Sequence, residues 1–137
     1  MISKLAFWGS RFILAYLFFF VNFFRYRRIS FDTYISVFSR NYSKRNTTIG
    51  KRSEIWRNVI IWISSEVEIG DYCQINPFSF ISGKVKIGNY VMIGPNVNIV
   101  GGSHNFADLD SPMRFQGSVY QEIIIQDDVW IGAGCNI

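Results

Sequence analysis

The sequence predicts an all-β fold, a solenoid of short parallel strands wound into a β-helix. Isoleucine recurs at every sixth residue through the middle of the chain, and a small or branched residue precedes each of these isoleucines by two places. Turn-forming residues separate the short strands that this pattern defines. A fixed short period is the signature of stacked repeats, in which each unit buries its apolar side chains against its neighbours.

The isoleucine column has two regular parts and a less regular start at Ile49 and Ile55. The regular positions are Ile69, Ile75, Ile81, Ile87, Ile93 and Ile99, then Ile125, Ile131 and Ile137. The residues two places earlier are Val67, Cys73, Ser79, Val85, Val91, Val97, Ile123, Val129 and Cys135. The side chains of the column isoleucines and of the residues two places before them are all expected to point inward.

The period excludes the two common alternatives. Six residues of an α-helix turn through about 600°, so every sixth residue cannot share one face. A β-sandwich has turns at about 8 to 12 residues. Here turn formers follow the isoleucines more closely, at Asp71, Pro77, Gly83, Asn89, Pro95 and Asp127. We therefore expect three strands per coil of about 18 residues, with Gly and Asn/Asp supplying positive φ angles at the corners.

The period breaks between residues 100 and 122. Ile125 lies 26 positions after Ile99, and 26 is not a multiple of six. A long loop inserted into a regular solenoid is usually functional. This loop contains His104, the only histidine of the chain.

Specific motifs flank the loop: Ser103-His104-Asn105-Phe106 before it and Val129-Trp130-Ile131-Gly132-Ala133 after it. Together with the repeat, they resemble the hexapeptide-repeat acyltransferases. The galactoside and maltose acetyltransferases and the O-acetyltransferases of bacterial polysaccharide biosynthesis look most similar. The resemblance covers residues 47–137 and implies a left-handed parallel β-helix, assembled as a homotrimer with each active site between two subunits.

The resemblance implies transfer of acetyl from acetyl-CoA to a sugar hydroxyl. His104 would be the general base, and the backbone N–H of Ala133 would face the oxyanion. Asn76 and Arg114 would contact the acceptor, and Trp130 would line the cleft on the CoA side. Each of these three residues also has a purely structural interpretation. Asn76 would be an ordinary corner residue, Arg114 would anchor the loop, and Trp130 would pack beneath it.

Neither metal chemistry nor covalent catalysis is expected. A single histidine excludes the three-histidine zinc site of the γ-type carbonic anhydrases, which share the solenoid. Cys73 and Cys135 fall at the small inward position of the repeat, so core packing is the better interpretation of both.

Residues 1–46 form a segment of different character. Residues 5–24 are largely apolar, and Arg25 to Arg28 follow directly. Arg11 within this run favours a helix in the membrane interface, through residues 5–28, over a true span. The basic cluster favours the cytoplasmic side of the membrane. No nucleic-acid-binding motif accompanies it.

The repeat has only just resumed when the sequence reaches Ile137. In the family that the chain resembles, further coils line the groove for the pantetheine arm of CoA. We therefore expect a C-terminally incomplete chain with weak or no activity. The alternative function is a non-catalytic, membrane-tethered β-helix module or an inactive remnant.

Overall fold

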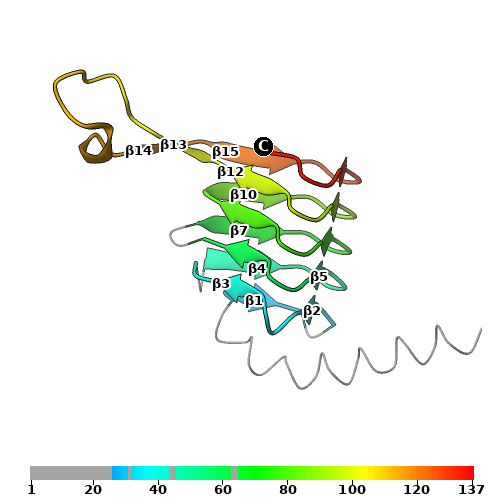
Figure 1. Ribbon diagram of the computed structural model, residues 1–137. Coiled ribbons are helices and arrows are strands. Elements are labelled where there is room, and N and C mark those ends of the chain that lie inside the picture. Colours follow the sequence, from blue (N-terminus) through cyan, green and yellow to red (C-terminus); the bar gives the residue numbers. More distant parts are fainter. Residues whose placement is uncertain (1–25, 31, 44–45, 63–64) are drawn as a thin grey trace, which may run out of the picture.

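The structure is a computed structural model that describes residues 26–30, 32–43, 46–62 and 65–137. It confirms the all-β solenoid: short strands follow one another around a three-sided column (Figure 1). The predicted membrane-seeking helix over residues 5–24 lies outside the described residues. Among the residues that are described, no helix is long and apolar enough to cross a membrane.

Each side of the column is one parallel sheet. The first sheet contains β1 (Arg28–Ile29), β4 (Thr47–Ile49), β7 (Glu66–Ile69), β10 (Lys84–Ile87) and β15 (Glu122–Ile125). The second contains β2 (Tyr34–Ile35), β5 (Glu54–Ile55), β8 (Gln74–Ile75), β11 (Met92–Ile93) and β16 (Trp130–Ile131). The third contains β3 (Arg40–Asn41), β6 (Ile60–Ile61), β9 (Phe80–Ser82) and β12 (Asn98–Val100). The described residues thus form four complete coils and two strands of a fifth. The left hand that the resemblance implies stays a prediction.

The isoleucine column forms the core, as predicted. In the second sheet Ile55, Ile75 and Ile93 pair in register, and each is at most 1% exposed. Identical side chains stacked at the strand spacing of about 4.8 Å fill the interior without gaps. Each coil therefore stabilises the next.

The solenoid begins earlier than residue 47, where the repeat was expected to start. The strands β1, β2 and β3 form a first coil, with Ile29, Ile35 and Asn41 in the column positions. The register Ile29↔Ile49 and Ile49↔Ile69 makes the first coils 20 residues long, whereas Ile69↔Ile87 gives the expected 18. The two extra residues shift the period and hide this coil in the sequence.

The corners correct one expectation about turn chemistry. Positive φ angles fall three residues after the column isoleucines. Asn58, Asn96 and Asp128 adopt them as expected, but so do four residues with larger side chains: Arg52, Tyr72, Phe78 and Tyr90. Gly70 and Gly88, by contrast, do not adopt positive φ. They are needed for close approach, because a Cβ on Gly70 would lie 2.5 Å from the carbonyl oxygen of Gly88. Coil stacking at this corner leaves room for backbone only.

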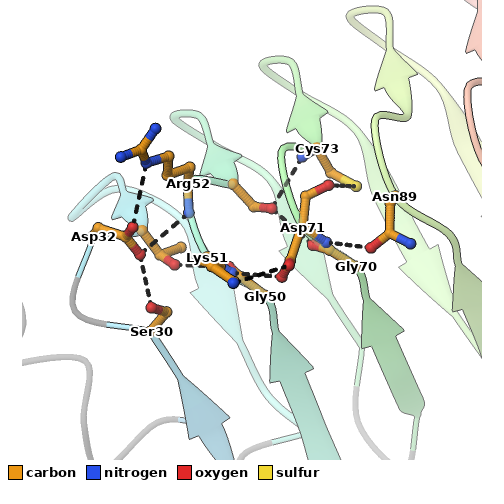
Figure 2. Close-up of polar contacts among 11 residues, drawn as sticks. Ser30, Asp32, Gly50, Lys51, Arg52, Gly70, Asp71, Cys73 and Asn89 are labelled. Carbon is orange, nitrogen blue, oxygen red and sulfur yellow. Dashed lines mark hydrogen bonds and ion pairs between the residues drawn. The ribbon is translucent and has the colours of Figure 1, made fainter.

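A ladder of side-chain caps runs up the corner between the first and second sheets (Figure 2). Asp71 accepts a hydrogen bond from the Lys51 N–H (2.9 Å), and Asn89 accepts one from the Asp71 N–H (2.9 Å). Asp127 accepts one from the Asn89 N–H (2.7 Å), and the Asn89 amide donates to both Asp127 oxygens. Each coil thus satisfies a turn N–H of the coil before it.

Asn89 separates two carboxylates in this ladder, so Asn89→Asp is expected to destabilise the solenoid by about 1 kcal/mol at neutral pH. The change removes the amide donor and sets three negative charges in a row. Repulsion raises the pKa of the introduced carboxyl, so the penalty should shrink as the pH falls through that pKa. Urea unfolding at neutral and acidic pH measures this. Asn96→Asp makes the same charge change at another corner and should have little effect; equal losses at both sites would contradict the ladder.

Candidate active site

The interruption after β12 is a projecting ribbon rather than an irregular loop. The strand β13 (Gly102–His104) pairs antiparallel with β14 (Ser118–Tyr120), and the short 3-10 helix η2 (Met113–Phe115) lies near the tip. Figure 1 shows this ribbon extending away from the column, on the side opposite β2 and β5. The sequence predicted the interruption over residues 100–122 but not its pairing.

Gln116 holds the tip of the ribbon together. Its amide nitrogen donates to the carbonyl oxygens of Asp108 and Ser111, both at 2.7 Å. Its amide oxygen accepts from the Asp108 N–H at 3.1 Å, and its own carbonyl accepts from the Asn105 side chain at 3.0 Å. These four hydrogen bonds anchor the tip of the ribbon.

Charged groups fix both ends of the insertion. At the tip, the Ser111 hydroxyl and the Asp110 backbone N–H hold the pKa of Asp108 below its usual value. At the base, Lys86 lies 3.0 Å and Lys84 3.5 Å from a Glu122 carboxylate oxygen. The hydrogen bond from Lys86 lowers the pKa of Glu122 and raises that of Lys86. These pairs tie the returning chain to β10.

His104 ends β13 with its side chain exposed. Its Nδ1 lies 3.3 Å from the Ser118 hydroxyl, because the ribbon register sets these two residues opposite each other. A groove of about 470 Å³ opens beside the imidazole. Its walls include Ser103, Asn105, Phe106, Asp108, Gln116 and Val119. The Ser118 contact was not predicted, since only the ribbon pairing reveals it.

The other predicted site residues lie elsewhere. Asn76 directly follows β8, where its amide donates 2.8 Å to the carbonyl oxygen of Ile93. Ala133 follows β16, and Trp130 within that strand is 75% exposed. All three belong to the second sheet or its corner. Arg114 is exposed in η2, on the ribbon that bears His104.

A single chain therefore does not assemble the predicted set. His104 and Arg114 project on the ribbon, whereas Asn76, Ala133 and Trp130 lie along the edge of the second sheet, on the other side of the column. A site that uses all five needs a second copy of the chain.

The cysteines differ from each other. Cys73 is buried, and burial raises the pKa of its thiol, which fits the predicted packing role. Cys135 is exposed, contrary to expectation; among the described residues, its coil packs against a neighbouring coil on one side. Within the described ranges, no cluster of His, Cys, Asp and Glu could hold a metal ion.

The repeat itself is similar to a known family of sequences. Residues 66–101 match the family model described as bacterial transferase hexapeptide (six repeats). Residues 66–101 thus carry the hexapeptide repeat that this family model describes. A search of curated proteins finds no match to the chain.

Solved structures share the fold of this chain. Three variants of AntD, an N-acyltransferase from Bacillus cereus, align over 85% of the chain, with 15%, 18% and 17% identity and TM-scores of 0.64, 0.72 and 0.62. The alignments cover 69%, 66% and 66% of the AntD chains. Two contain dTDP and coenzyme A; the third contains dTDP-4-amino-4,6-dideoxyglucose and coenzyme A. The likeness establishes the fold.

Proposed function

We propose that the protein is an acetyl-CoA-dependent O-acetyltransferase that modifies a sugar in bacterial surface polysaccharide biosynthesis. The observation that carries the proposal is His104, an exposed imidazole on a braced ribbon that projects from a hexapeptide-repeat solenoid. The CoA-bound AntD structures support an acyl-CoA donor.

The contact with Ser118 suits a general base. When Nδ1–H donates to the Ser118 hydroxyl, Nε2 keeps its lone pair and can take the proton of the sugar hydroxyl. The sugar oxygen then attacks the thioester carbonyl, and the C–S bond of acetyl-CoA breaks. The proton passes from the imidazolium to the departing CoA sulfur, which leaves an acetyl ester and free CoA.

We further propose that the remaining roles are filled in a homotrimer, with each site formed between two subunits. Within it, the Ala133 N–H would stabilise the oxyanion, and Trp130 would line the CoA side. Asn76 keeps its amide oxygen for the acceptor, because its nitrogen already donates to Ile93. Arg114 would contact the acceptor from the ribbon. Exposed apolar residues there, including Leu109 (95%) and Phe115 (77%), support burial against a neighbour.

An amino sugar is the second candidate acceptor. AntD is an N-acyltransferase, and one of its structures contains a dTDP-linked 4-amino sugar. A neutral amine is a better nucleophile than a hydroxyl and depends less on a base to remove its proton. The two candidates therefore differ in how strongly they need His104.

The proposal is tested by following CoA release from acetyl-CoA with two matched acceptors, a hydroxyl sugar and the corresponding amino sugar, each free and nucleotide-linked. The proposal predicts release with the hydroxyl acceptor and an ester product by mass spectrometry. An amide product alone would favour the second candidate. Absence of release from a trimeric preparation that binds CoA would favour the non-catalytic module.

We also propose that the protein works at the cytoplasmic face of the membrane, through residues 5–28. Undiminished co-sedimentation with membranes by a chain that lacks residues 1–30 would contradict that assignment.

A further inference from the structure

Charge along the solenoid axis is strongly asymmetric. Described residues 26–62 contain six basic side chains and two acidic ones. Residues 65–137 contain three basic and eight acidic side chains. Because coils stack in chain order, this asymmetry in sequence becomes an asymmetry in space. The first two coils form a positive end, and the later coils and ribbon form a negative one.

The six basic residues encircle the positive end, and we call them the basic collar: Arg27, Arg28, Arg40, Lys51, Arg52 and Arg57. All six are exposed. Arg28 is in the first sheet, Arg40 is in the third, and Lys51, Arg52 and Arg57 lie at corners. Within the basic collar, two residues form ion pairs with described residues: Arg52 with Asp32 at 3.6 Å, and Lys51 with Asp71 at 3.9 Å.

We infer that the basic collar docks the first coil end-on against an anionic lipid surface. The second coil lies about 4.8 Å beyond the first, so the whole collar stays within the Debye length of about 10 Å at 0.1 M salt. The acidic coils extend away from the surface. Phe38, 67% exposed in the turn after β2, offers the first coil an aromatic contact with the lipid interface.

The sequence next to the collar favours lipid over nucleic acid as the partner. The largely apolar run of residues 5–24 ends immediately before Arg25 to Arg28, so the chain reaches the collar from a segment with lipid-like composition. The inference extends the proposed contact of residues 5–28 to the folded coils. It is independent of acyl transfer.

The test is flotation of the full chain with phosphatidylcholine vesicles, with and without phosphatidylglycerol. The variant R40Q/K51Q/R57Q leaves residues 1–28 unchanged. It should bind anionic vesicles more than about tenfold more weakly, since each basic residue near such a surface contributes about 1 kcal/mol. The control K84Q/K86Q/R114Q removes equal formal charge from the later coils and ribbon, and should change binding by less than about twofold.

Equal losses in the two variants would show that only net charge matters and would overturn the docking geometry. Unchanged binding in the collar variant would overturn it too. Wild-type binding should also weaken as salt rises, which tests the inference without any variant. Tighter binding to duplex DNA than to anionic vesicles would replace the proposed partner. Vesicle binding is read without turnover, so its failure is distinct from failure of the acetyltransferase assignment.

Discussion

Replacing His104 with alanine is expected to lower the rate of CoA release by about 100- to 10,000-fold with a hydroxyl acceptor. The variant loses the imidazole that lines the ribbon groove and contacts the Ser118 hydroxyl, which is the group that the proposal assigns as the base. The loss should fall mainly on kcat, since imidazole removes the proton during attack rather than during binding. Steady-state kinetics with a thiol reagent measure it.

The control for this prediction lies in the same ribbon. Asp110→Asn keeps the backbone N–H that donates 2.9 Å to Asp108 and changes only an exposed carboxylate. It should retain activity within about threefold. An H104A variant as active as D110N would remove the general-base assignment, and activity with an amine acceptor that falls only slightly in H104A would favour N-acylation.

Replacing Ile75 with alanine is expected to reduce the free energy of unfolding by about 2 to 5 kcal/mol. Ile75 is fully buried at the centre of the column, with Ile55 in the coil before and Ile93 in the coil after. Truncation leaves a cavity that two neighbouring coils cannot both close. Since coils touch only their neighbours, the lost contacts should loosen the middle of the stack. Urea unfolding followed by circular dichroism measures the change.

Two further variants calibrate this effect. Ile75→Val removes one methylene and should cost about 0.5 to 1.5 kcal/mol. Met92→Ala changes the outward-facing neighbour of Ile93, which is 49% exposed, and should cost no more than about 0.5 kcal/mol. If M92A destabilised the protein as much as I75A, the inward column would not be the main source of stability.

The regular part of the fold could be predicted because its signal is local. From Ile69 to Ile99 every column position holds the same residue at one spacing, and all six are buried. The first coil gave no such signal. Asn41 takes a column position there, and Thr33 and Ser39 take inward positions where their hydroxyls donate to backbone carbonyls. Buried polar residues that satisfy the backbone do not look like a core in sequence.

The site was less predictable than the fold. The motif around His104 predicted a general base, but it is the pairing across the ribbon that brings Ser118 to the imidazole, and this pairing depends on the path of residues 105–117. Asn76 and Ala133 lie apart from His104 because they follow strands of the second sheet, whereas the ribbon leaves the column after the third sheet. The spacing of these residues in the sequence does not reveal this arrangement. Sequence motifs name such residues without showing that they come from different sides of the column.

The repeating coil also allows the length of the column to change in regular steps. One regular coil, residues 70–87, could be duplicated in the gene, and the copy would meet the same isoleucines and the same glycine corner on both sides. Each duplication would lengthen the column by about 4.8 Å and leave every existing contact type intact. The distance between the basic end and His104 can thus change only in fixed increments. Selection could adjust the reach of the ribbon without inventing new packing.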